Sequence, residues 1–137
     1  MKKQIIPTKQ DYNKILGSII THIEQSKLRA FAEVNKALLQ AYWSIGKELS
    51  KNAGYGESIV EQLSKDLRLK YPDVKGYYGR NLWNMKRFYE TYQKLQPVVA
   101  ELLFKVSWTN HILILDKTSS DEEKQFWNVR CCFDCNI

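Results

Sequence analysis

Residues 80–94 read RNLWNMKRFYETYQK, and this stretch decides which fold the chain can adopt. Its apolar residues recur every three or four positions, which is the period of an amphipathic α-helix. They are Leu82, Met85, Tyr89 and Tyr92. The opposite side of the helical wheel carries Arg80, Trp83, Asn84, Arg87 and Thr91. The stretch therefore predicts a helix from Arg80 to about Lys94, with one face in the core and one basic face directed outward.

A second amphipathic pattern precedes this helix, with apolar residues at Ile59, Val60, Leu63 and Leu67. Ser58 and Glu61 have the spacing of a capping box, which predicts a helix start. Tyr71 comes before Pro72, and a residue before proline is pushed out of the α-helical region. A turn that contains glycine then leads to Arg80. Two helices joined in this way predict a helix-turn-helix, with residues 80–94 as its second helix.

The N-terminal third carries a much longer amphipathic pattern. Thr8 and Asp11 offer N-cap chemistry, and apolar residues follow at intervals of three and four over residues 12–49. No proline interrupts the chain between positions 7 and 72. The pattern predicts one long helix, or a helical hairpin bent near residues 25–28. A pattern of this length is typical of helix-on-helix packing or of a homodimer seam.

Shorter helices are predicted for the C-terminal third. Pro97 ends the preceding helix, Ser107 or Thr109 can cap another, and residues 118–121 can turn the chain and cap the next. The predicted fold class is therefore all-α: a long N-terminal helix or helical hairpin, a helix-turn-helix and short C-terminal helices. We expect the domain to span residues 8–127. Residues 128–137 are Cys-rich and lack a period, so we expect an aberrant or disordered tail.

The composition favours one ordinary domain. With 137 residues, 44% of them hydrophobic, and a net charge of +6, the chain is not disordered, fibrous or multi-domain in type. No apolar run approaches the about 20 residues of a membrane-spanning helix, and the first residues lack a signal peptide, so we expect no membrane partner and a cytoplasmic location. The three cysteines lie within the last seven residues and the two histidines are isolated, so we expect no metal site.

The basic excess is concentrated around the predicted helix-turn-helix. Between residues 61 and 94, eight Lys and Arg residues stand against four Asp and Glu residues. Arg and Asn can make bidentate hydrogen bonds to bases in the major groove, and Lys can neutralise phosphates. The candidate contacts to double-stranded DNA are Arg80, Asn81, Trp83, Asn84, Lys86, Arg87, Lys75 and Lys65. Two alternatives stay open: the charges form a solvated face, and Trp83 packs on another helix or a partner domain.

The sequence offers no catalytic constellation. It contains no P-loop, no dinucleotide-binding fingerprint, no zinc-protease motif and no nucleophile elbow. Pro72-Asp73 and Glu122-Glu123-Lys124 imitate the order of acids in a metal-dependent nuclease site. Such a site needs its acids on adjacent strands, whereas these lie in a predicted turn and a predicted helix start. We assign no catalytic residue and no cofactor.

Five segments, in order, resemble the N-terminal domain of the YhcG family of bacterial nuclease-like proteins over about residues 10–127. They are Tyr42-Trp43-Ser44-Ile45-Gly46-Lys47-Glu48, Gly54-Tyr55-Gly56, Leu63-Ser64-Lys65-Asp66-Leu67, the stretch from Arg80 to Tyr89, and Val106-Ser107-Trp108-Thr109-Asn110-His111. In that family a helical, DNA-binding domain precedes a nuclease domain of the P-D-(D/E)-x-K superfamily. The resemblance implies a module that delivers a nuclease domain to DNA. The alternative is an interaction module, in which the long first helix dimerises and the Trp83 face docks a nuclease domain from another chain.

Two departures from the family pattern stand out. Gly79 occupies the position before the Arg-Asn pair where the family usually has a serine cap. After Trp127 the family continues into more helix and a catalytic domain, whereas this chain stops at residue 137. We therefore expect a truncated member that does not itself cleave DNA.

Overall fold

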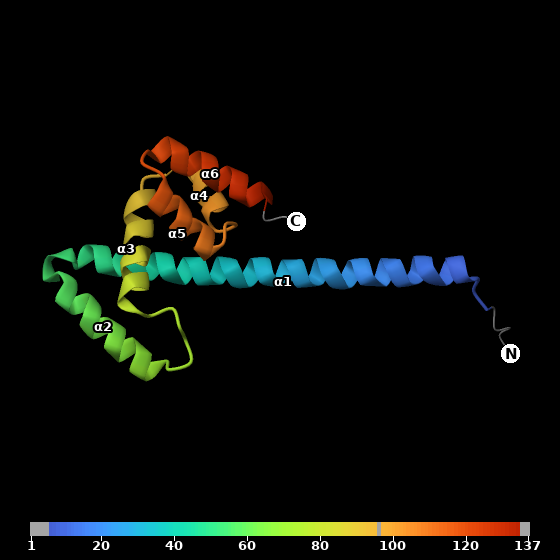
Figure 1. Ribbon diagram of the computed structural model, residues 1–137, viewed down its shortest axis with the longest axis horizontal. Coiled ribbons are helices and arrows are strands. Elements are labelled where there is room, and N and C mark those ends of the chain that lie inside the picture. Colours follow the sequence, from blue (N-terminus) through green and yellow to red (C-terminus); the bar gives the residue numbers. More distant parts are fainter. Residues whose placement is uncertain (1–5, 96, 135–137) are drawn as a thin grey trace. The chain divides into compact units, whose positions relative to one another are not determined.

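The structure is a computed structural model that describes residues 6–95 and 97–134. These residues form six α-helices and one 3-10 turn, and no β-strand, so the all-α prediction is confirmed (Figure 1). The chain divides into two compact units, Met1–Val34 and Asn35–Ile137, and each is described by itself. None of the helices in the described ranges is both long and apolar enough to cross a membrane.

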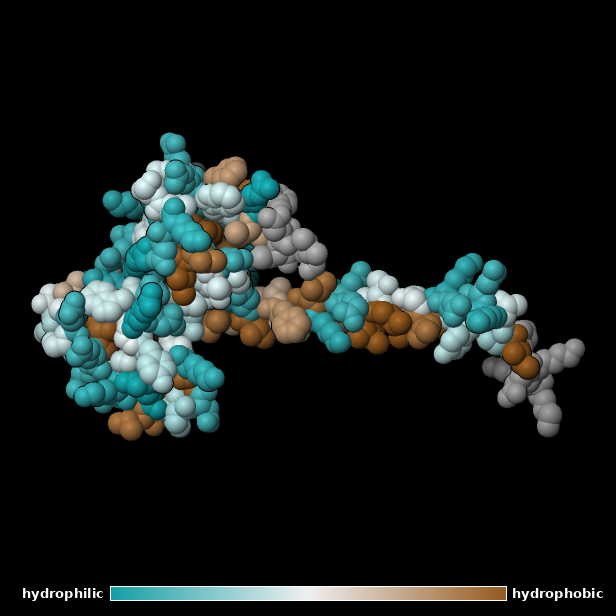
Figure 2. Space-filling model, in the orientation of Figure 1, coloured by the Kyte–Doolittle hydropathy of each residue, from teal (hydrophilic) through white to brown (hydrophobic). Residues whose placement is uncertain are grey.

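Helix α1, Lys9–Lys51, is continuous. Thr8 caps it, because its Oγ1 accepts a hydrogen bond of 3.1 Å from the Asp11 backbone N–H. The helix passes through residues 25–28 without a break, so the alternative of a helical hairpin was wrong. In the first unit its large apolar side chains remain exposed, and Figure 2 shows hydrophobic residues gathered along one side of α1.

The second unit contains the end of α1 and all later elements. These are η1 (Ala53–Tyr55), α2 (Glu57–Lys70), α3 (Gly79–Tyr92), α4 (Pro97–Leu103), α5 (Trp108–Lys117) and α6 (Asp121–Asp134). Helices α2 and α3 pack on each other, as the sequence predicts. Their connection, residues 71–78, is longer than the about three or four residues that join a DNA-binding helix-turn-helix.

Two clusters of the core meet at Trp108. The first joins α1, α2 and α3 through Tyr42, Leu49, Val60, Leu82 and Met85. The second joins α3, α4 and α5 through Phe88, Tyr92, Leu103 and Leu115. The Trp108 ring packs against both, with its centroid 4.8 Å from that of Tyr42 and 5.4 Å from that of Phe88, both edge-to-face. Trp108 therefore holds the two halves of the unit together.

Helix α1 approaches α3 closely at Gly46. A Cβ atom added to Gly46 would lie 2.1 Å from the backbone oxygen of Met85 and 3.1 Å from the Cβ of Tyr89. No side chain fits in that space, so glycine is required where the two helices cross.

The caps predicted at the starts of α5 and α6 form, whereas the cap predicted at the start of α2 does not. Ser107 caps α5 by accepting from the Asn110 N–H, and Ser120 accepts from the Glu123 N–H at the start of α6. At α2 the predicted capping box does not form. The helix begins at Glu57 after Gly56, whose φ of 74° favours glycine, and Ser58 donates to a carbonyl of the preceding turn.

Helix α6 passes the expected domain boundary at residue 127 and continues to Asp134. Asn128 is 1% exposed, and its side-chain amide donates to the Tyr92 hydroxyl and to the Lys124 carbonyl. The first residues of the expected tail are therefore ordered by contacts with the core. Residues 135–137 lie outside the described residues.

His111 is a fully buried polar residue in the second unit. Its Nε2 lies 2.6 Å from the Leu103 carbonyl, and because a carbonyl can only accept, Nε2 carries the proton. Its Nδ1 is buried without a hydrogen-bond partner among the described residues. Burial lowers the pKa of His111 to about 4, against which the hydrogen bond to Leu103 acts only in part. His111 is therefore a neutral, structural histidine.

The substitution Gly46→Ala is expected to lower the free energy of unfolding by about 1–3 kcal/mol, because the new methyl group forces α1 away from α3. Gly17→Ala is the matched control, since its Cβ meets nothing within 4 Å and alanine favours a helix. Urea unfolding followed by circular dichroism measures both. Equal stability of the two variants would contradict the close approach.

The protein is expected to lose stability as the pH falls from about 6.5 towards 4. In that range unfolded His111 binds a proton that the folded protein excludes, so the free energy of unfolding falls by about 1.4 kcal/mol per pH unit. Urea unfolding at pH 7 and pH 5 tests this. The variant His111→Gln should be less stable at pH 7 but should show a smaller change between the two pH values; an unchanged difference would exclude His111 as its cause.

Candidate nucleic-acid interface

The orientation of α3 sets which of its residues reach solvent. Leu82, Met85, Phe88 and Tyr92 are buried. The helical wheel had placed Tyr89 in the core with the first two, but Tyr89 is half-buried and Phe88 is fully buried. The reason is that α3 packs against α5 as well as against α1 and α2, which widens its buried arc.

The outward face of α3 forms a shallow groove. Five of the eight predicted contact residues line it together with one acid: Arg80, Trp83, Asn84, Lys86, Arg87 and Glu90. Lys65 on α2 and Lys75 in the connection to α3 are exposed but do not line the groove. The outward face of α3 is therefore basic, as the sequence predicts. Its side chains differ in whether groups inside the protein already bind them.

Lys86 lies over the indole of Trp83, with its Nζ 4.7 Å from the ring centroid. The same Nζ is 3.7 Å from the Glu90 carboxylate, and the Lys86 side chain is only 17% exposed. Glu90 also accepts a hydrogen bond of 3.1 Å from Ser50 on α1. The C-terminal end of the groove thus holds a positioned carboxylate, which repels phosphate, so the favourable end is the N-terminal one.

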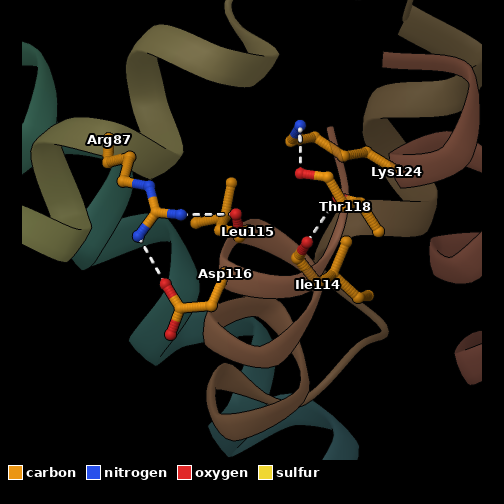
Figure 3. Close-up of polar contacts among 6 residues, drawn as sticks. All are labelled: Arg87, Ile114, Leu115, Asp116, Thr118 and Lys124. Carbon is orange, nitrogen blue, oxygen red and sulfur yellow. Dashed lines mark hydrogen bonds and ion pairs between the residues drawn. The ribbon is translucent and has the colours of Figure 1, made fainter. Parts of the chain in front are cut away.

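Arg87 connects α3 to α5 (Figure 3). Its Nη1 is 2.6 Å from an Asp116 carboxylate oxygen, and its Nη2 donates to the Leu115 carbonyl. Both partners belong to the last turn of α5. The guanidinium that the sequence suggested as a DNA contact is therefore occupied by internal partners.

Asn81 is also committed inside the protein. Its Nδ2 donates to the Gly76 carbonyl at 2.7 Å, and its Oδ1 accepts from the Trp108 indole at 2.8 Å. Burial raises the pKa of the Tyr42 hydroxyl, and a hydrogen bond with Asn81 opposes this in part. Because both ends of the amide are used, Asn81 fixes the start of α3 and leaves no group for a base.

Arg80 is the exposed cation at the start of α3. It takes part in none of the ion pairs found within the described ranges. Tyr78 is the N-cap residue of α3, and no side chain caps the helix there. Gly79 is the first residue of the helix and not its cap, so the helix begins one residue earlier than the family pattern suggested. A helix N-terminus without a side-chain cap, next to an arginine, favours a phosphate.

No local sequence pattern indicates the partners of Asn81 and Arg87. Trp108 and Asp116 belong to α5, which α4 separates from α3, and nothing in the local pattern links them to Asn81 and Arg87. The imitated nuclease motif does not assemble into a cluster. Within residues 6–95 and 97–134, no group of three or more His, Cys, Asp or Glu residues is placed to hold a metal ion.

A family model described as the DUF1016 N-terminal domain matches residues 18–134. The chain therefore belongs to this family of helical N-terminal domains. Among curated proteins it is similar to "Putative nuclease YhcG" from Escherichia coli (strain K12), with 28% identity over 96 residues. The matched region covers 65% of this chain and 25% of the relative. These findings confirm the resemblance to the YhcG family. No solved structure matches the chain.

Arg87→Ala is expected to lower the free energy of unfolding by about 0.5–1 kcal/mol, because it removes the hydrogen bond to the Leu115 carbonyl and an ion pair with Asp116 that solvent screens. Arg80→Ala removes the same charge from the same helix and should change stability by less than about 0.5 kcal/mol. Urea unfolding of both variants is the measurement. A coupling of zero between Arg87→Ala and Asp116→Ala would contradict the ion pair.

Proposed function

We propose that this chain is a double-stranded DNA-binding module that contacts the duplex with the N-terminal end of α3. The observation that carries the proposal is the exposed Arg80 beside a helix start without a side-chain cap, at the end of the groove away from Glu90. Trp83, Asn84 and Lys86 continue the same face, and Lys75 and Lys65 are exposed cations on the elements that precede it.

Phosphate contacts dominate the proposed binding. The predicted base contacts of Asn81 and Arg87 are dropped, because their polar groups are used inside the protein. The remaining cations and the backbone N–H groups at the start of α3 suit phosphate oxygens, which position a protein without reading sequence. Weak sequence preference and an affinity that falls as salt rises follow from this composition of the face.

The family supplies the wider context. The relative in E. coli is named as a nuclease, and the matched region is a quarter of its length. We propose that the module serves a nuclease of this kind by bringing a nuclease domain to DNA. No residue of this chain is given a catalytic role, no cofactor is required, and the cytoplasmic location stays a prediction.

Fluorescence anisotropy of a labelled duplex, titrated with the chain at several salt concentrations, tests the proposal. We expect log affinity to fall linearly with log salt. Arg80→Glu should weaken binding by about tenfold or more and reduce the salt slope by about one or more, because it removes a phosphate contact and adds a repulsive charge. Its folding should be unaffected, since Arg80 is exposed.

Lys105→Glu is the matched control. Lys105 is exposed between α4 and α5, so its reversal changes the net charge equally without touching α3. Equal loss of affinity in the two variants would show that binding follows net charge alone and not the α3 face. A folded chain that binds no duplex at low salt would favour the alternative, a module whose Trp83 face docks a nuclease domain.

A further inference from the structure

The first unit presents an apolar stripe along α1. We define it by the large apolar side chains on one side of the helix: Tyr12, Ile15, Leu16, Ile19, Ile20, Ile23, Phe31 and Val34. Their exposed fractions run from 41% for Leu16 to 71% for Phe31. The opposite side carries polar and charged residues, among them Lys14, Ser18 and Gln25. None of this apolar surface belongs to the core clusters of the second unit.

The stripe is larger than the surface of a folded monomer normally leaves exposed. Eight half-exposed side chains of this size present on the order of 600 Å² of apolar surface, whereas exposed patches on monomers seldom exceed a few hundred. That area is most of the about 800 Å² that each partner buries in a standard interface. An amphipathic helix gains most of its stability by packing such a face.

The repeat of the stripe suits a straight helical partner. Tyr12, Ile23 and Val34 are spaced by 11 residues, and Ile20 and Phe31 have the same spacing. Eleven residues take about three turns of an α-helix, so the stripe stays nearly parallel to the helix axis over its whole length. A second straight helix can therefore contact both parts of the stripe, residues 12–23 and 31–34, which residues 24–30 separate.

The charges along this part of α1 fit a second copy of the chain. Residues 9–34 carry Lys9, Lys14, Lys27 and Arg29 against Asp11, Glu24 and Glu33, which leaves them close to neutral. Lys27 and Glu24 already pair within the helix, at 3.8 Å. A strongly charged partner would find no opposite net charge along these residues. Two copies of the stripe are nearly neutral and apolar, so they do not repel each other. We propose that two copies of this chain pair through the stripe to form a closed homodimer.

Sedimentation equilibrium of the full chain, under reducing conditions and over a range of concentrations, tests the proposal. We expect the mass to rise from 16.1 kDa to twice that value and to stop there. Ile19→Glu with Ile23→Glu should raise the dissociation constant by at least about tenfold, because two carboxylates enter the apolar seam. Ser18→Glu with Gln25→Glu places two carboxylates on the opposite side and should leave the mass unchanged.

A second pair of variants guards against loss of the helix. Ile19→Ala with Ile23→Ala removes apolar area but retains helix propensity, so circular dichroism should stay constant at concentrations where the dimer dissociates. A dissociation constant on the order of 100 μM marks a weak dimer. A chain that is still monomeric at that concentration would overturn the proposal. So would a dimer that the stripe variants leave intact, or a mass that rises beyond two copies. DNA binding by Arg80 is measured separately, so either proposal can fail alone.

Discussion

The close approach of α1 and α3 at Gly46 is the constraint on which the second unit depends. The Met85 carbonyl occupies the space that a side chain would need, so the two helices cross at backbone contact. That crossing brings Leu82 and Met85 against Tyr42 and Leu49 of α1 and against Val60 of α2. Because this side of α3 is packed against α1 and α2, the helix cannot rotate about its axis, and its opposite side stays exposed to solvent. The basic face is therefore a consequence of how the core packs, and its exposure does not rest on the charges themselves.

Two polar contacts then hold α3 in place, one near its start and one beyond its middle. Near its start, Asn81 joins the connection from α2 to the Trp108 indole of α5. Further along, Arg87 holds the last turn of α5 through Leu115 and Asp116. Both contacts consume groups that look suited to nucleic acid when only the sequence is read. Under the proposed function, DNA would contact the exposed part of the same face, centred on Arg80, on a helix whose position is already fixed.

The fold could be predicted from the sequence to a large extent, because its helices are specified locally. The three- and four-residue periods, the caps at Thr8, Ser107 and Ser120 and the stop at Pro72 all depend on residues within one turn. Which polar side chains of α3 are bound inside the protein, and which face solvent, could not be predicted. Asn81 lies next to Arg80, but its amide is bound to the Gly76 carbonyl and to the distant Trp108 indole, whereas Arg80 faces solvent. Likewise, Phe88 is buried because α5 packs on it, and α6 extends past residue 127 because Asn128 contacts Tyr92.

Helix α1 combines two kinds of surface in one element. From Leu39 to Leu49 its apolar residues are buried in the core of the second unit, whereas from Tyr12 to Val34 they remain exposed. A monomer gains little from the second set, since side chains that stay about half exposed contribute only part of their apolar burial. If two copies pair through that set, the dimer holds two α3 faces, and a duplex bound by one meets the second at a raised effective concentration. A face that offers few phosphate contacts binds weakly by itself. Pairing along α1 would therefore supply affinity that the composition of α3 does not.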